Sequence, residues 1–157
     1  MIELVRLQLA DVATAEALLE LQRRAYRVEA DLIGSDDIPP LHETLHQLQT
    51  CGETFLGALV EGEIAGVISW RLRDRTIDIH RLVVDPRRFR QGLGVTLVRA
   101  ALTAEPRAER AIVQTGAKNV PAKALYRREG FEQIDEVQLG ADLRVARFVK
   151  RLGPVSE

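Results

Sequence analysis

A chain of 157 residues is the size of one ordinary domain and can bury a single hydrophobic core. It carries 22 basic and 23 acidic residues, and its net charge of −1 is far from the basic balance that nucleic-acid binding usually requires. No apolar run approaches the roughly 20 residues of a membrane span, and the first residues lack the pattern of a secretory signal. The only cysteine, Cys51, excludes an intrachain disulfide. We therefore expect one cytoplasmic domain, residues 1–157, without nucleic-acid or membrane partners.

The first half of the chain alternates short apolar runs with turn residues, which predicts a strand, two helices and three strands. Asp11 suits the N-cap of the first helix, because its carboxylate can accept from the free amides of the first turn. Pro39 and Pro40 exclude regular helix before the second helix, and Asp85-Pro86 ends the fourth strand. The predicted elements are a strand over residues 2–9, a helix over 12–31, a loop over 33–40, a short helix over 41–49, and strands over 54–60, 64–70 and 77–84.

The second half adds two more helices and three more strands. Gly92 and Gly94 precede a helix, and Pro121 suits the first turn of the next one. Gly130 suits a left-handed stop at the end of that second helix. The predicted elements are a helix after residue 94, a strand over 112–115, a helix opened by Asn119, and strands over 131–139 and 143–150. The order is strand, two helices, three strands, helix, strand, helix and two strands, which indicates a mixed α/β fold.

A glycine-containing turn between a strand and a helix lies within residues 82–98, LVVDPRRFRQGLGVTLV. Helix N-termini expose unpaired N–H groups and a partial positive charge, so this turn can seat a pyrophosphate. No Gly-Lys-Ser/Thr follows, which excludes a P-loop, and Leu97 stands where a dinucleotide fingerprint has its third glycine. The local cluster of Arg87, Arg88 and Arg90 favours a small phosphorylated ligand over a polymer.

Two motifs in this half resemble the GNAT superfamily of acetyltransferases. Gly92 and Gly94, behind the strand end Val84-Asp85-Pro86, are similar to the coenzyme A motif of that family, Gln/Arg-x-x-Gly-x-Gly/Ala. Phe89 stands where the family has Gln or Arg, which is a departure. Residues 119–131, NVPAKALYRREGF, look like the family segment Asn-x-x-Ala-x-x-Leu-Tyr-x-x-x-Gly-Phe. Two motifs in the correct order are much more specific than either alone.

The resemblance implies a single GNAT-like α/β domain of the α+β type, with a mixed, mostly antiparallel sheet of about seven strands and four helices. It implies acetyl-CoA as the acyl donor and no metal. Backbone amides of the glycine turn would hold the pyrophosphate, and the preceding strand would pair with the pantetheine arm as if with an added strand. The implied cofactor-binding residues are Leu82, Val83, Val84, Arg90, Gln91, Gly92, Leu93, Gly94, Val95 and Asn119.

By the same resemblance, Tyr126 would lie near the sulfur and stabilise or protonate the departing thiolate. The implied reaction is direct attack by a neutral amine on the thioester, with a strand amide steadying the oxyanion. The proton of the amine needs an acceptor. On a regular strand Asp78 and His80 share a face with Leu82, so either one, or a water between them and the amine, is a candidate base. Sequence does not choose between the two.

The acceptor pocket is less determined. The resemblance places the region between the first two helices beside it, and residues 29–37 include four carboxylates. Glu29 and Tyr26 are therefore candidate substrate residues for a cationic amine, although caps and solvated loop carboxylates explain the same pattern as well. The acceptor, an acyl donor longer than acetyl, and the oligomeric state, with a homodimer as one option, stay open.

Two alternative functions compete with this one. In the first, the chain binds coenzyme A without transferring anything and acts as a sensor or partner module. In the second, residues 42–46, HETLH, spell the H-E-x-x-H of zinc hydrolases, with His42 and His46 one helical turn apart beside Glu43. The longer form of that motif wants a glycine and a third histidine, and Gln49 and Gly52 occupy those positions. Glu61 or Glu63 could supply a third ligand only from a predicted hairpin.

Overall fold

The computed structural model describes residues 1–34, 42–141 and 143–153 as seven strands and four α-helices, with the 3-10 turn η2 (Pro86–Arg88) before the third helix. The strands are β1 (Ile2–Arg6), β2 (Thr54–Val60), β3 (Glu63–Arg73), β4 (Thr76–Val84), β5 (Arg110–Gly116), β6 (Glu132–Gln138) and β7 (Arg144–Arg151). The helices are α1 (Val12–Ile33), α2 (Leu45–Gln49), α3 (Leu93–Thr103) and α4 (Val120–Arg128). The part of the predicted loop that contains Pro39 and Pro40 falls on residues 35–41, which lie outside the described residues.

The seven strands form one sheet in the order β1-β2-β3-β4-β5-β7-β6. Within the described chain, β4 and β5 are the one parallel pair, and the other neighbours are antiparallel. The predicted order of elements, the mixed α/β class and the mostly antiparallel sheet are therefore confirmed. No helix in the described ranges is long and apolar enough to cross a membrane.

Turn and cap residues explain most of the boundaries. Asp11 caps α1 by accepting from the Thr14 amide at 3.2 Å, and Gly34 ends that helix with a φ of 72°. Between β2 and β3, Glu61 and Gly62 both have positive φ, at 53° and 81°, as a tight two-residue hairpin turn requires. The predicted cap and hairpin are confirmed.

Two predicted boundaries move for reasons of capping. The second helix begins at Leu45 and not at residue 41, because Thr44 forms a capping box with Gln47. The third helix begins at Leu93, so Gly94 lies inside its first turn instead of before it. A Cβ on Gly94 would come within 3.3 Å of Leu125 Cδ2, so this glycine also allows α3 to approach α4 closely.

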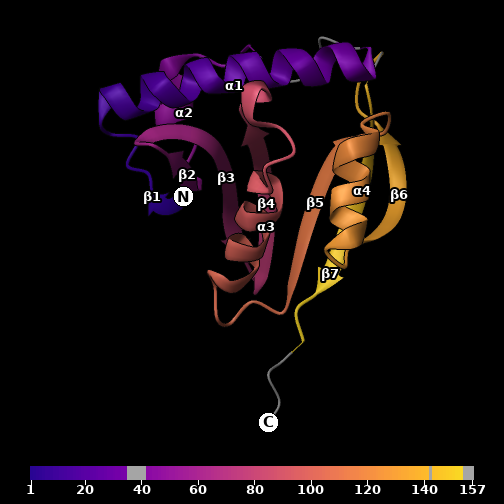
Figure 1. Ribbon diagram of the computed structural model, residues 1–157. Coiled ribbons are helices and arrows are strands. Elements are labelled where there is room, and N and C mark those ends of the chain that lie inside the picture. Colours follow the sequence, from indigo (N-terminus) through magenta and orange to yellow (C-terminus); the bar gives the residue numbers. More distant parts are fainter. Residues whose placement is uncertain (35–41, 142, 154–157) are drawn as a thin grey trace.

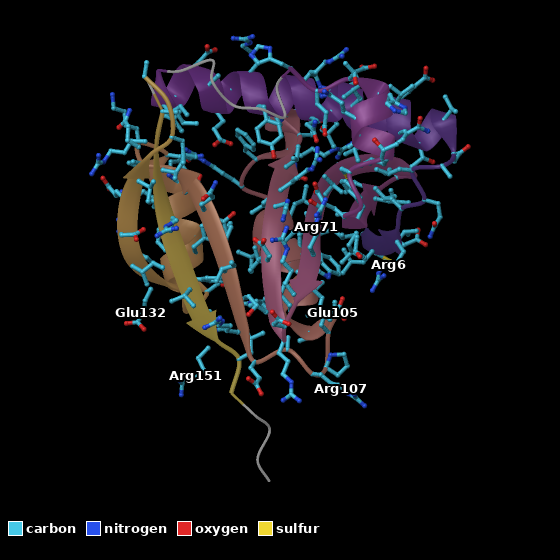
Figure 2. All side chains as sticks on the ribbon, turned by 180° about the vertical axis from the view of Figure 1, so that it is seen from behind. Arg6, Arg71, Glu105, Arg107, Glu132 and Arg151 are labelled. Atoms are coloured by element: carbon cyan, nitrogen blue, oxygen red, sulfur yellow. The ribbon has the colours of Figure 1, made fainter. Side chains whose placement is uncertain are left out.

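The sheet carries a core on each face. One cluster joins α1 and α2 to side chains such as Phe55 and Val83, and the other joins α3 and α4 to side chains such as Ile68 and Phe148. α3 and α4 lie side by side over one face, and α1 crosses one end of the sheet (Figure 1). Seen from behind, the face opposite α3 and α4 carries side chains such as Arg71 (Figure 2).

The sheet opens between its two parallel strands. β4 and β5 pair over Thr76–Asp78 and Arg110–Ile112, and no pairing continues from Ile79 to Val84. The two strands then separate toward the end of the sheet that α1 crosses (Figure 1). Backbone groups on this side of β4 are thus available to a ligand that enters as an extra strand.

Candidate active site

A hollow of about 380 Å³ fills the opening between β4 and β5. Its walls include residues of β4, β5, α4, α1 and β7, namely Ile79, Leu82, Val113, Thr115, Ala122, Tyr126, Tyr26, Glu29 and Val145. Polar groups enter the hollow from the sheet, such as His80 and Thr115, and from the helices, such as Glu29 and Tyr126. A narrow, largely apolar slot with a few converging polar groups has the usual character of a small-molecule site.

A cradle of main-chain amides lies at the N-terminus of α3. Gly92 caps the helix in the left-handed conformation at φ 79°, and Arg90 also has a positive φ, 68°. Thr96 N–H makes the first intrahelical bond, to the Gly92 carbonyl at 3.0 Å. The amides of Leu93, Gly94 and Val95 precede that bond, and no side chain caps them. Such a terminus binds anions, and a diphosphate group fits its chemistry.

The arginines next to this cradle divide into two kinds. Arg87 Nη2 donates to Asp85 Oδ2 at 2.8 Å and lowers the pKa of Asp85 to about 2. Its charge is therefore already matched by a carboxylate. Arg88 and Arg90 remain as the cations beside the turn, where the sequence predicted positive charge. Phe89, the departure from the family motif, is half exposed between them.

Tyr126 borders the hollow with a buried ring. Its ring packs edge-on against Phe131 at 5.6 Å and against Phe148 at 5.8 Å between centroids. Burial raises the pKa of Tyr126, and the nearby Glu29 carboxylate raises it further. The phenol therefore keeps its proton at neutral pH and can donate it or a hydrogen bond.

Glu29 and Asn119 tie α1 to α4 at the mouth of the hollow. The Asn119 side-chain oxygen caps α4 by accepting from the Ala122 amide at 3.2 Å, and its side chain also hydrogen-bonds the Glu29 carboxylate. Gly116 supplies a second, backbone hydrogen bond to Glu29. Burial raises the pKa of Glu29, and these two bonds partly offset that effect. Asn119 thus has a structural role beside the cofactor contact predicted for it.

β4 contains a bulge at His80. Ser69 of β3 pairs with Arg81, and Trp70 pairs with Ile79, so His80 is an extra residue without a partner across the ladder. A bulge bends the strand and turns the side chain of its extra residue away from the regular direction. His80 Nε2 lies 3.2 Å from Asp78 Oδ2, so the two candidate bases are in contact.

The bulge corrects one prediction about these residues. Ile77, Ile79 and Leu82 all pack in the cluster beneath α3 and α4, which a regular alternation from 79 to 82 does not allow. Asp78 lies between Ile77 and Ile79, so it lies on the opposite face from Leu82. The predicted shared face of Asp78, His80 and Leu82 is wrong, because one inserted residue reverses the alternation.

A second hollow of about 430 Å³ adjoins the first. It is bordered by Asp78, Ile112, Ile134, Arg147 and Phe148, among others. The two hollows share four residues, namely Ile79, His80, Val113 and Gln114. His80 therefore lies at the junction of the two hollows, where a ligand bound between β4 and β5 would reach the second hollow.

A buried ionic network supports the bulge, and the sequence interpretation did not identify it. Arg81 is 5% exposed, and its Nη2 donates to Glu43 Oε2 and Glu53 Oε2, both at 3.0 Å. Gln22 of α1 accepts from Arg81 Nη1 at 2.8 Å and donates to Glu43. Ser69 donates to Glu53 at 2.6 Å. The one signal in the sequence was a cation directly before the apolar residues Leu82, Val83 and Val84 at the end of β4.

This network also explains the H-E-x-x-H motif. His42 precedes α2, so the two histidines are not one turn apart on a helix, and Glu43 is the ionic partner of Arg81. Within the described residues, no group of three His, Cys, Asp or Glu side chains could hold a metal ion. The geometry that the zinc-hydrolase alternative requires is absent from this part of the chain.

Residues 15–131 match the acetyltransferase (GNAT) family. The chain belongs to this family. The structure is similar to the ribosomal-protein-S18-alanine N-acetyltransferase of Escherichia coli, with a TM-score of 0.79 at 16% identity over 100% of this chain and 97% of that one. It is also similar to the PaiA N-acetyltransferase of Thermoplasma acidophilum in complex with coenzyme A, with a TM-score of 0.72 at 19% identity over 96% of this chain and 99% of that one. At these identities the likeness shows the fold.

A relative in sequence, UPF0157 protein YqkA of Bacillus subtilis, is 35% identical over 142 residues, which make up 90% of this chain and 41% of that protein. The chain thus spans less than half the length of this relative. The family that residues 15–131 match is one of acetyltransferases. The second motif lines the opening between β4 and β5 through Asn119, Ala122 and Tyr126, and the first lies at the start of α3, where Gly94 approaches Leu125 of α4.

Proposed function

We propose that this acetyltransferase transfers an acetyl group from acetyl-CoA to an amine of a small molecule or a protein, in the reducing cytoplasm that its lone Cys51 suits. Two features together support it most: the N-terminus of α3 has no side-chain cap, and the edge of β4 after Asp78 is not paired with β5. The diphosphate and the peptide-like pantetheine arm of the donor need these two features together.

In this proposal the donor lies along β4. Amides from Arg90 to Val95 receive the diphosphate, and Arg88 and Arg90 add charge. The backbone of Leu82–Val84 pairs with the pantetheine arm, which places the thioester near the junction of the two hollows. Asn119 borders the same slot and would contact the arm while capping α4.

The acyl transfer needs an oxyanion donor, a proton acceptor and a proton donor. A β4 amide near Val83 or Val84 is our candidate for the oxyanion donor. His80 is the candidate acceptor of the amine proton, with Asp78 beside it as the alternative. Tyr126 is the candidate donor to the departing thiolate, since its raised pKa keeps the phenol protonated. A pH profile of His80→Gln and Asp78→Asn distinguishes the two bases, because only loss of the base removes the rise of kcat with pH.

The acceptor end of the site carries more negative than positive charge. Arg81 borders the first hollow, but Glu43 and Glu53 match its charge, so the Glu29 carboxylate is left uncompensated beside Tyr26. We infer that the acceptor is an amine with a second positive charge near the reacting nitrogen. Glu29→Gln should raise KM for such acceptors more than for singly charged ones, and Glu20→Gln, an exposed carboxylate on the same helix, should leave KM unchanged.

Thiol release tests the proposal. Acetyl-CoA is incubated with polyamines, aminoglycosides, amino acids and peptide N-termini, and free thiol is measured. Turnover with at least one amine class supports acetyl transfer. A faster rate with a longer acyl-CoA would identify that compound as the preferred donor, and the reaction would still be acyl transfer to an amine. Tight binding of coenzyme A without turnover of any acceptor would favour the silent binding module instead.

A further inference from the structure

Glu53 is a buried carboxylate next to His80 that the chemistry above does not use. It precedes β2, its side chain is 6% exposed, and three donors hold it. Oε1 accepts from Ser69 Oγ at 2.6 Å and from Arg81 Nε at 2.8 Å, and Oε2 accepts from Arg81 Nη2 at 3.0 Å. Oε2 also lies 3.6 Å from His80 Nδ1. A carboxylate fixed in this way presents one oxygen to the imidazole in a constant position.

The two ring nitrogens of His80 face different carboxylates. Nδ1 faces Glu53, which is buried, and Nε2 faces Asp78, which borders the second hollow. In a neutral imidazole one nitrogen carries a proton and the other a lone pair. Asp78 is the nearer carboxylate, at 3.2 Å from Nε2 against 3.6 Å from Nδ1 to Glu53, but its side chain is 25% exposed, whereas Glu53 is 6% exposed and fixed by Ser69 and Arg81. The fixed, buried carboxylate therefore favours the tautomer with the proton on Nδ1, and that tautomer leaves Nε2 as the basic atom.

We propose that Glu53 is a positioning residue for His80, which keeps the proton of the neutral ring on Nδ1 so that Nε2 accepts the proton of the attacking amine. This inference rests on the proposed function, in which His80 is the proton acceptor. As the bond from nitrogen to the acyl carbon forms and the bond from that carbon to sulfur breaks, the amine proton passes to Nε2, directly or through water. Tyr126 Oη supplies a proton to the thiolate.

The same arrangement stabilises the product of that proton transfer. The imidazolium has Glu53 beside Nδ1 and Asp78 beside Nε2, so each N–H gains a charged acceptor. The charged groups that surround His80 are Glu53 before β2, Asp78 and Arg81 of β4, Arg147 of β7 and Glu29 of α1. The Glu53 carboxylate raises the pKa of His80 and outweighs burial, which lowers it. His80 is therefore a stronger base than an isolated imidazole, and it is available as a base only above that raised pKa.

The chain offers a matched pair of variants for testing this. Glu43 and Glu53 both bind Arg81, but Glu53 alone of the two contacts His80. In Glu53→Gln, NMR titration of the His80 ring should give a lower pKa than in the wild type, and the acid limb of kcat against pH should move to lower pH with it. Glu43→Gln should leave the His80 titration unchanged. An equal shift in both variants would overturn the inference, because the effect would then come through Arg81.

A measurement on the unaltered protein covers the case in which Glu53→Gln does not fold. The ¹⁵N shifts of His80, assigned by comparison with His80→Gln, should show a protonated Nδ1 and an unprotonated Nε2 above the pKa. The opposite tautomer would overturn the role of Glu53. These ring signals do not depend on turnover. If the ring signals appear as expected while His80→Gln keeps full activity, His80 is not the base of the proposed reaction. The effect of Glu53 on the His80 tautomer would still be supported.

Discussion

Removal of the Arg81 side chain tests whether the network under the bulge is as buried as its geometry indicates. In Arg81→Met, Glu43 and Glu53 keep their charges but lose their shared cation, in a place where their side chains are 12% and 6% exposed. Breaking one partner of a buried ion pair costs about 3–5 kcal/mol of unfolding free energy. For a chain of this length, that corresponds to a fall in Tm of roughly 6–20 °C.

The unfolding free energy lost in Arg81→Met should depend on pH in a definite direction. Burial alone would raise the pKa of Glu53, but the nearby His80 ring and the hydrogen bonds from Arg81 and Ser69 hold it below its usual value. A carboxylate whose pKa is lower in the folded state stabilises the fold at pH values above its unfolded pKa of about 4.3. This stabilisation is lost as the pH falls toward the pKa of the folded state. The difference in stability between wild type and Arg81→Met should therefore be largest near neutral pH and narrow below about pH 4.

Denaturant unfolding at several pH values measures this difference. Arg147→Met is the matched control, because Arg147 forms a two-bond pair with Asp135 whose side chains are 47% and 40% exposed. Its loss should cost less than about 1 kcal/mol. Adding Glu43→Gln and Glu53→Gln to Arg81→Met should recover much of the loss, because no charge is then left unpaired. A loss in Arg81→Met as small as that in Arg147→Met would refute the reasoning.

Two further predictions concern the walls of the first hollow. Tyr126→Phe should keep its Tm, since the ring contacts with Phe131 and Phe148 remain, and lower kcat by about 10²-fold; turnover equal to wild type across pH would show that the hydroxyl is not the acid. Gly116→Val should lose about 1–3 kcal/mol of unfolding free energy, because a Cβ there would lie 2.8 Å from Ile33 Cγ2. Ile33→Ala in the same chain should restore part of that loss, and no recovery would place the strain elsewhere.

The fold could be predicted because its signals are local. Asp11 as a cap, the Glu61-Gly62 turn and Gly130 after α4 each fix a boundary through the conformation of one or two residues. The start of α2 was placed at residue 41, after Pro40, because the prediction did not take the capping box of Thr44 and Gln47 into account. Glu43, directly before this cap, forms its ion pair with Arg81, a contact between distant parts of the chain.

The site could be predicted only in part, since part of it depends on residues far apart in the chain. The cradle at Gly92 and the position of Tyr126 follow from contiguous motifs. The partners of Arg81 come from α1, the segment before α2 and the segment before β2, so no spacing in the sequence connects them. The bulge at His80 is likewise invisible in the sequence, because it is defined by pairing with Ser69 and Trp70 on another strand.

Calorimetric titration with coenzyme A tests the central claim, that main-chain amides at the start of α3 bind the diphosphate. We predict binding by the wild type and strong loss in Gly92→Val, because valine is disfavoured at the left-handed φ of 79° that shapes the cradle. Gly62→Val is the control, because Gly62 has nearly the same φ, 81° against 79°, in a hairpin away from the site. It should bind like the wild type. No heat with the wild type, or equal affinity in Gly92→Val, would contradict the account.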